Sequence, residues 1–488
     1  MGELCLSRRD FLRKSALAGA FGAAGPVLLG SAGTGVAAMA PSTQASSPNV
    51  PRAGRFLLKN GCVLSLDPKV GDFPSADVLI DGARIAEVRP SITAAGAQVI
   101  DCSNMIVMPG FVDTHRHMWL GPLRNLQPDG RLSDYGRDFN NTARKVYRPE
   151  DVYIGNLVSA LGALNGGVTT IFDFSNISNT PAHSDAAIQG LRESGIRGVY
   201  GFGYGYPNAP GTQFPQDIKR LRTQYFSSDD QLLTLKIAAN PNAAEWAAAR
   251  DVGAPIHVHI LGNKALLKLA DAMGPDITYI HCVNLVAEEW PLIAKSGGSV
   301  SIACPIEMEM GHGVPPIQEC LDHGIRPSLS TDVETQMPGE FFTQMRSLFT
   351  LQRMQVFTRE RAGDKAVPRL LTSREVLEFA TIEGARENHV DRKAGTLTPG
   401  KDADVLLLRV NEINTLPLNN AYGAVLLAMD SSNVDTVFVA GRPRKWQGRL
   451  VDVDLARIRK LAEASRDHIF AQTGWPRDIL RGGGGFVS

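Results

Sequence analysis

Eight short apolar runs recur between residues 105 and 332, and each is separated from the next by enough residues for a helix. The segment 182–194, for example, carries Ala187, Ile188 and Leu191 at helical spacing. Because strands that alternate with helices build parallel sheets, eight such units predict an α/β fold, a (β/α)8 barrel of the TIM type. The predicted strands span residues 106–112, 168–174, 198–204, 232–238, 256–261, 278–282, 299–304 and 327–330.

Residues outside the barrel have β character at both ends of the chain. Between residues 55 and 104, apolar runs are interrupted by Asn60-Gly61 and Asp81-Gly82, dipeptides typical of hairpin turns. The β character returns over residues 391–452, so we expect both ends to form one small β-sandwich domain beside a barrel of residues 105–390. A Pro- and Ser-rich linker precedes the sandwich at 41–54, and a helix and tail follow at 453–488.

The first 40 residues carry the features of an export signal in the expected order. The pair Arg8-Arg9 is followed by Phe11-Leu12, then by a weakly apolar Gly/Ala-rich stretch and a run of small residues. This order resembles a twin-arginine signal peptide, which the twin-arginine export machinery recognises on a folded protein. We therefore expect residues 1–40 to be removed and the protein to be periplasmic or extracellular. The alternative is a basic N-terminus without a targeting role.

The composition argues against several classes of protein. Lys+Arg and Asp+Glu number 50 each, and this balance gives no support for a nucleic-acid partner, which needs a positive surface. Six cysteines without a CxxC pair argue against a disulfide scaffold and a structural zinc knuckle. No run of about 18 apolar residues is present, so the sequence predicts no stable membrane span.

Residues of the types that bind metals stand at the ends of four predicted strands. They are His115 and His117 after the first strand, His257 and His259 in the fifth, His281 in the sixth and Asp332 after the eighth. The C-terminal ends of barrel strands meet at one face, where catalytic residues gather. Residues two apart in a strand point to the same side, so both members of a pair can face one ion. Several imidazoles with one carboxylate suit zinc or ferrous iron.

Four segments make the sequence similar to a known family. Residues 107–117 (Val-Met-Pro-Gly-Phe-Val-Asp-Thr-His-Arg-His) resemble the strand-1 signature of the amidohydrolase superfamily, and residues 167–170 (Gly-Val-Thr-Thr) resemble its strand-2 pattern. Residues 395–404 and 433–441 resemble the strands that return to the family's β-sandwich. Within the superfamily, the resemblance is to the branch of aminohydrolases, the deaminases that act on nucleobases and triazines.

The resemblance implies one divalent metal ion, zinc in preference to iron. The ligands that it implies are His115, His117, His281, Asp332 and one strand-5 histidine, for which it favours His259 over His257. A divalent ion lowers the pKa of bound water to about 7, and Asp332 is expected to orient that water and accept its proton.

Two positions depart from the aminohydrolase pattern. Gly262 stands where the family commonly has a glutamate that shuttles protons, and Asn284 stands where a second strand-6 histidine is common. Both changes remove an acid–base group beside the metal. The segment after the seventh strand opens onto the same face of the barrel, and it offers Glu307 and His312 as catalytic replacements. The alternative for Glu307 is an ordinary surface charge.

Three further residues are candidates for substrate binding. Trp119 lies two residues after the His pair and is expected to form a flat wall for a ring, or else to pack in the core. Asn284 lies beyond the sixth strand, and His183 follows the second, where a helix-cap role is the alternative. Lys236 on the fourth strand fits only loosely a carboxylated lysine that bridges two metals, so one metal is expected.

These observations predict a metal-dependent amidohydrolase that hydrolyses a non-peptide C–N bond of a small cyclic or heteroaromatic compound. The first alternative is a cyclic amidase that opens a ring instead of releasing an amine. The second is a non-catalytic binding protein built on the same barrel. Specificity in this architecture lies in loops, so the sequence leaves open the substrate, the metal and whether the protein is a homo-oligomer.

Overall fold

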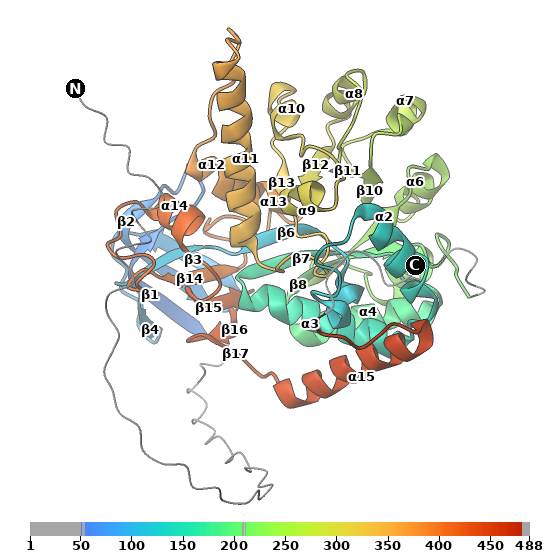
Figure 1. The fold of residues 1–488 in the computed structure, drawn as a ribbon. Helices are drawn as coiled ribbons and strands as arrows, with labels where there is room; N and C mark the ends of the chain where they lie inside the picture. The colour runs from blue at the N-terminus through green and yellow to red at the C-terminus, as the bar shows by residue number, and fades with distance from the viewer. Residues whose placement is uncertain (1–49, 51–53, 207–208, 210, 481–488) are drawn as a thin grey trace, which may run out of the picture. The chain divides into compact units, whose positions relative to one another are not determined.

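The predicted runs form a barrel of eight parallel strands (Figure 1). Its strands are β6 (Phe111–Arg116), β7 (Val168–Ser175), β8 (Arg197–Gly203), β9 (Leu233–Ala239), β10 (Ile256–Ile260), β11 (Ile277–His281), β12 (Ser299–Ile302) and β13 (Ser328–Leu329). Neighbours in sequence are neighbours in the sheet, and a parallel bridge between Arg116 and Asp332 joins the first strand to the last. The barrel prediction is confirmed.

The computed structural model describes residue 50, residues 54–206, residue 209 and residues 211–480. The predicted export segment, residues 1–40, and most of the predicted linker lie outside the described residues. Among the helices of the described chain, none is long and apolar enough to cross a membrane.

The first predicted strand, 106–112, is wrong in one respect, because it breaks into two strands at Gly110. Strand β5 (Met105–Pro109) pairs with a strand from the C-terminal part of the chain, whereas β6 begins the barrel at Phe111. A Cβ added at Gly110 would lie 2.0 Å from the Thr169 hydroxyl oxygen, so only glycine fits where the chain passes between the two sheets. The barrel therefore begins at residue 111, and the N-terminal β region extends to residue 109.

Helices follow the barrel strands on the outside. They are α3 (Pro149–Asn165), α4 (Pro181–Ser194), α5 (Ile218–Gln224), α6 (Ala243–Arg250), α7 (Ala265–Leu269), α8 (Glu289–Ser296) and α10 (Ile317–Asp322). The last strand is followed by α11 (Phe341–Arg361), α12 (Ser373–Glu378) and α13 (Gly384–Glu387), the last two joined by the π-helical turn η5 (Phe379–Glu383). Shorter elements stand in the loops after β6 and β12: η1 (Met118–Leu123), α2 (Leu132–Tyr135), η2 (Gly136–Asn140), η3 (Ala143–Lys145) and α9 (Cys304–Glu309).

Both ends of the chain contribute to a second, nine-stranded sheet, as predicted. It contains β5 with β1 (Arg55–Val63), β2 (Phe73–Asp81), β3 (Arg84–Arg89), β4 (Gln98–Asp101), β14 (Val405–Arg409), β15 (Val434–Val439), β16 (Arg442–Trp446) and β17 (Arg449–Leu450). Strands β1 and β15 are separated in the sheet by β5 and β14, yet the rings of Phe56 and Phe438 lie 5.3 Å apart. The sheet therefore curls over a shared apolar core, and helix α15 (Leu455–Thr473) follows it.

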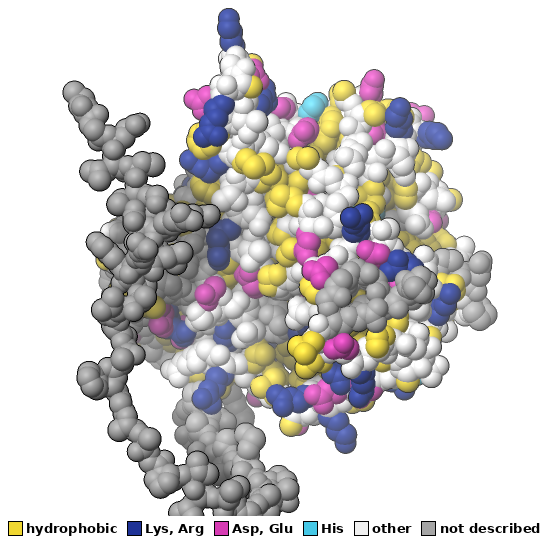
Figure 2. Space-filling view, in the orientation of Figure 1, with side chains coloured by type: hydrophobic (Ala, Val, Ile, Leu, Met, Phe, Trp, Pro, Cys, Tyr) yellow, Lys and Arg dark blue, Asp and Glu magenta, His cyan; other side chains and the backbone are white. Residues whose placement is uncertain are grey.

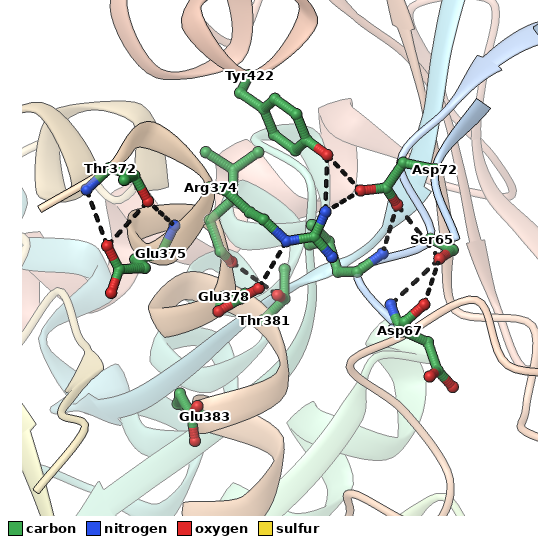
Figure 3. Close-up of polar contacts among 12 residues, drawn as sticks. Ser65, Asp67, Asp72, Thr372, Arg374, Glu375, Glu378, Thr381, Glu383 and Tyr422 are labelled. Atoms are coloured by element: carbon green, nitrogen blue, oxygen red, sulfur yellow. Dashed lines mark hydrogen bonds and ion pairs between the residues drawn. The ribbon is translucent and has the colours of Figure 1, made fainter. Parts of the chain in front are cut away.

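A polar cluster joins the β domain to the barrel (Figure 3). Asp72, in the loop between β1 and β2, accepts hydrogen bonds from the guanidinium of Arg374 and the hydroxyl of Tyr422. Arg374 belongs to α12 and also donates to Glu378 at 2.9 Å. Arg326, just before β13, donates to the same Glu378 at 2.6 Å. These contacts fix the start of β13, and Asp332 follows this strand.

Candidate metal centre

Five side chains from four barrel strands converge at the C-terminal face of the barrel. They are His115 in β6, His117 directly after it, His259 in β10, His281 in β11 and Asp332 after β13. The Nε2 atoms of His115 and His259 lie 3.2 Å apart. Asp332 Oδ1 lies 3.2 Å from Nε2 of His115 and 3.5 Å from Nε2 of His117, and its Oδ2 lies 3.7 Å from Nε2 of His281. The four rings and the carboxylate therefore face one small volume.

Backbone hydrogen bonds set the register of this cluster. The amide of Asp332 donates to the carbonyl of His115 at 2.9 Å, and the amide of His117 donates to the carbonyl of Asp332 at 2.8 Å. Arg116 points away from the cluster, where its guanidinium pairs with Asp113 at 2.7 Å and donates to the Thr331 hydroxyl at 2.9 Å. The closure of the barrel between β6 and β13 thus aligns three of the five candidate ligands.

Two ligand rings are oriented by hydrogen bonds at Nδ1, the ring nitrogen that faces away from the cluster. Nδ1 of His117 donates to the Asn176 side-chain oxygen at 3.0 Å, and Nδ1 of His281 donates to Glu307 Oε1 at 3.0 Å. A proton on Nδ1 leaves the lone pair of Nε2 facing the cluster. This is the arrangement in which a histidine binds a metal while its other nitrogen is hydrogen-bonded.

The protonation states of three of the four histidines suit a metal; burial alone would lower the pKa of His281 as well, but the two carboxylates beside it together raise it. Burial, with the charge of His115 second, lowers the pKa of His117 to about 3, and burial lowers the pKa of His115 and of His259. Burial by itself would raise the pKa of Asp332, but the hydrogen bond from His115 and the charges of the clustered histidines together outweigh it and hold that pKa well below its usual range. Neutral imidazoles and an ionised carboxylate are the forms that coordinate divalent cations, so the donor set fits zinc or ferrous iron.

The two strand-5 histidines lie in different surroundings. His259 belongs to the cluster, whereas His257 is completely buried one layer lower in the barrel. His257 stacks on Phe172 with ring centroids 3.8 Å apart, and its Nε2 lies 3.2 Å from the carbonyl oxygen of Thr114. Lys236 donates to the carbonyl of Glu387 at 2.5 Å, below the cluster. The geometry therefore places His259 in the ligand set and keeps both His257 and Lys236 out of it.

Glu307 and His312, the predicted catalytic replacements, lie on the same side of the cluster. Glu307 is completely buried, and its Oε1 accepts from His281 and from the backbone amide of Ala303 at 2.9 Å. Glu307 therefore positions a ligand ring through Oε1, while its Oε2 has no hydrogen-bond partner among the described residues. His312 lies against His281 with ring centroids 4.8 Å apart, and neither of its ring nitrogens has a hydrogen-bond partner among the described residues.

Of the candidates for substrate binding, Trp119 and His183 lie elsewhere. Trp119 is completely buried, and its indole donates to Asn176 at 2.8 Å, so it orients the partner of His117 and does not form a wall for a ring. Both ring nitrogens of His183 have partners, the Thr180 hydroxyl at 2.8 Å and the carbonyl of Tyr147 at 3.0 Å. His183 therefore supports the start of α4, which was the alternative considered.

Asn284, the third candidate, positions the His312 loop. Its side-chain amide donates to the carbonyl of His312 at 2.7 Å. A Cβ at Gly262 would lie 2.4 Å from the Asn284 carbonyl oxygen, and a Cβ at Gly313 would lie 2.8 Å from its side-chain oxygen. The loop after β10 therefore has no room for the family's glutamate. His312, whose backbone carbonyl is held by Asn284, presents on this side of the cluster an imidazole without a hydrogen-bond partner among the described residues.

Two residues of the site were missed from the sequence. Asn176 follows β7, and the sequence does not mark its role, because an amide is not among the usual metal-ligand types and its contact with His117 exists only in the folded chain. Tyr135 lies in α2, in the long loop after β6, where no sequence signal marks it. Its ring lies 6.4 Å from that of His117, and its buried hydroxyl has no hydrogen-bond partner within the described part of the chain.

An open apolar groove lies apart from this cluster. It has a volume of about 680 Å³ and lies among α9, α10 and α11, where Figure 2 shows hydrophobic side chains gathered. Met308, Val314 and Met354 line it, and none of the five clustered side chains does. The groove is therefore not the place where the metal-binding residues act.

Several proteins similar to this chain are named as deaminases. The chain is 25% identical over 437 residues to the 5'-deoxyadenosine deaminase of Methanosarcina barkeri, which covers 85% of this chain and 98% of the relative. It is 22% identical over 432 residues to the 5-methylthioadenosine/S-adenosylhomocysteine deaminase of Pyrococcus horikoshii, covering 83% and 97% of the two chains.

Solved structures share the fold. A zinc-bound adenosine deaminase from Xanthomonas campestris superimposes with a TM-score of 0.75 at 21% identity, covering 86% of this chain and 100% of the other. The atrazine chlorohydrolase of Arthrobacter aurescens gives 0.72 at 20% identity, covering 84% and 100%. Residues 106–444 match the amidohydrolase family, so this chain, with its cluster of four histidines and one aspartate, belongs to the amidohydrolase family and is a metal-dependent hydrolase of C–N bonds.

Proposed function

We propose that this protein is a zinc-dependent deaminase of small heteroaromatic compounds. The observation that carries the proposal is the position of His312, a buried imidazole with no partner among the described residues, directly beside a ligand histidine. It compensates for the missing family glutamate at Gly262 and the missing family histidine at Asn284. The deaminase names of the similar proteins support the reaction type.

The chain's own residues divide the work of hydrolysis. The four histidines and Asp332 would hold a divalent ion, which would supply an activated water at neutral pH. Asp332 holds the attacking water by hydrogen bonding and takes its proton. Burial lowers the pKa of His312 to about 4, so the ring is neutral; it takes over the proton that Asp332 removed from the water and passes it to the departing nitrogen, since an amine leaves as ammonia only when it is protonated. Asn176 and Glu307 keep two ligand rings in the required tautomer.

Ammonia release from a panel of aminated nucleobases, triazines and hydantoins tests the proposal. We expect the zinc-loaded protein to release ammonia from at least one heteroaromatic amine. His312→Gln should retain zinc and lose about 10²- to 10⁴-fold in turnover, the usual contribution of one acid–base group. His281→Ala should lose most of its zinc. Normal turnover in His312→Gln would remove His312 from the mechanism.

A cyclic amidase reaction is the second candidate, and the absence of both usual proton-transfer residues of the aminohydrolases favours it. The same panel separates the two reactions by mass spectrometry. Ring opening adds one water to the substrate and releases no ammonia, whereas deamination replaces an amino group by oxygen.

A further inference from the structure

Arg144 is a buried cation without an anion beside it. Its side chain lies in η3 and is 3% exposed. No aspartate or glutamate of the described residues forms an ion pair with it, and its Nε atom has no hydrogen-bond partner among them. The titratable groups that act on its charge are three tyrosines, Tyr204, Tyr135 and Tyr206. Burial accordingly lowers the pKa of the guanidinium.

The guanidinium is fixed at the catalytic face of the barrel. One of its nitrogens, Nη2, donates to the carbonyls of Tyr204 at 3.1 Å and Gly205 at 2.6 Å, the residues that directly follow β8. The guanidinium carbon lies 5.3 Å from the centre of the Tyr204 ring. The carbonyl of Arg144 itself accepts from Asn179 at 2.8 Å. Since β8 ends at the same face as the ligand strands, Arg144 stands at the rim of the same site.

Tyr135 connects Arg144 to the metal-binding residues. Its ring contacts His117, as described above, and the charges of both Asp332 and Arg144 act on its hydroxyl. That hydroxyl is buried and has no partner in the described chain. Two donors without partners among the described residues therefore stand at the edge of the site: the Tyr135 hydroxyl beside His117, and the Arg144 Nε–H beside the end of β8.

Burying a hydroxyl and a guanidinium N–H without hydrogen-bond partners is unfavourable, unless a bound ligand supplies the partners. A buried unpaired charge is among the most destabilising features of a folded protein, and buried polar groups are otherwise satisfied in the great majority of cases. Backbone carbonyls satisfy two of the Arg144 hydrogens but bring no negative charge.

From this geometry we infer that Arg144 and Tyr135 bind an anionic oxygen of the substrate, a carboxylate or a deprotonated ring oxygen, while its C–N bond lies at the metal-binding residues. The substrate is then a negatively charged heteroaromatic amine. This inference rests on the proposed function for the reaction but not for the binding of the anion. It distinguishes the substrate from adenosine and 5'-deoxyadenosine, which carry no charge in the neutral pH range.

Paired probes that differ only in charge test the inference. N9-carboxyalkyl adenines with side arms of increasing length are compared with their carboxamides, by calorimetric binding to the zinc-loaded protein and by ammonia release. We expect at least one carboxylate to bind about 10- to 100-fold more tightly than its amide, the range for a hydrogen bond to a charged group. Arg144→Gln should abolish that difference in affinity, and Tyr135→Phe should reduce it. In both variants the affinity for the amide should stay the same.

A matched control is Arg192→Gln, because Arg192 also lies over a tyrosine ring, at 4.9 Å from Tyr225, but on the exposed side of α4. It should leave both affinities unchanged. Equal affinities for acid and amide in the wild type, or a preference that survives in both Tyr135→Phe and Arg144→Gln, would overturn the inference. If binding shows the preference but no probe releases ammonia, the deaminase proposal fails and the anion site stands. Tyr135→Phe keeps the ring and its packing, so it remains informative if Arg144→Gln does not fold.

Discussion

Glu307 influences metal binding by orienting the ring of His281. Its Oε1 holds Nδ1 of the ligand ring, and burial raises the pKa of its carboxyl. A carboxylate behind a ligand histidine fixes the tautomer and increases the basicity of the ring. We therefore assign Glu307 to metal affinity and His312 to proton transfer, although both residues follow the same strand.

Glu307→Gln should weaken zinc binding by about 10- to 100-fold, the typical loss when such a partner is changed. Competition against a chromophoric chelator measures this affinity. Glu309→Gln, an exposed neighbour on the same helix, is the control and should bind zinc as the wild type does. Unchanged zinc affinity together with a large loss of turnover in Glu307→Gln would return Glu307 to direct catalysis.

Glu387 should make stability depend on pH. Burial raises its pKa to about 8, and one carboxyl oxygen accepts from the Ser328 hydroxyl deep in the barrel. A raised pKa stabilises the fold fully below the unfolded-state pKa, and this contribution is lost as the pH rises through about 8. Glu387→Gln removes the titration.

The stability of the wild type relative to Glu387→Gln should therefore fall by roughly 4 kcal/mol between about pH 5 and about pH 9. Urea unfolding at each pH gives the free energy of unfolding of both proteins. Subtracting the value for the variant from that for the wild type removes contributions that both proteins share. A difference that stays constant over this range would show that Glu387 does not titrate as its burial predicts.

The ligands themselves could be predicted because strand alternation and the barrel rule act locally. His115 and His117 share a side of one strand, and every strand end of a barrel reaches the same face. The roles of Trp119 and His183 could not be predicted, because they depend on contacts with Asn176 and the carbonyl of Tyr147, which only the folded chain brings near.

At the level of elements, the loops after β10, β11 and β12 form one packed unit around Asn284. The residues after β11 adopt left-handed conformations, with φ of 52° at Cys282 and 58° at Asn284, and Gly262 in the neighbouring loop has φ of 71°. Such conformations are unfavourable for residues other than glycine and cluster at functional sites. Here they direct Asn284 toward the His312 loop.

Gly262→Ala should destabilise the protein by about 1–3 kcal/mol and lower turnover, because the added methyl group meets the Asn284 carbonyl oxygen and displaces the support of His312. Thermal unfolding and turnover measure the two effects. Gly253→Ala is the control, since φ is 65° there but a Cβ would meet nothing within 4 Å. Equal effects of the two substitutions would show that the contact with Asn284 is unimportant.

The boundaries of an element could be predicted where the periodicity of apolar residues determines them. They could not be predicted where one apolar stretch supplies strands to two different sheets. The barrel strands agree with their predicted spans within a few residues, for example β7 at Val168–Ser175. The run 106–112 is interrupted only at Pro109-Gly110, and nothing in it shows that β5 pairs with β14 while β6 pairs with β7. That pairing depends on residues about 300 positions later in the chain, as the Met108–Leu406 pair illustrates.

At the scale of the whole molecule, we propose that the protein is exported through the twin-arginine route. The five cysteines of the described residues are all free, and export of a folded, metal-loaded protein is compatible with this. Expression of the full chain should yield a periplasmic protein whose first residue lies near position 40. Arg8→Lys combined with Arg9→Lys should leave the longer precursor in the cytoplasm, as fractionation and mass spectrometry would show. Undiminished periplasmic protein in that variant would contradict the route.

Reactivation of the metal-free protein by zinc tests the central claim most directly. The claim is that one ion, held by His115, His117, His259, His281 and Asp332, is required for hydrolysis. Product formation should be absent after chelation and should rise in proportion to added zinc until one ion is bound per chain. Full hydrolysis in the metal-free protein, or a rise that ends only at two ions per chain, would contradict it.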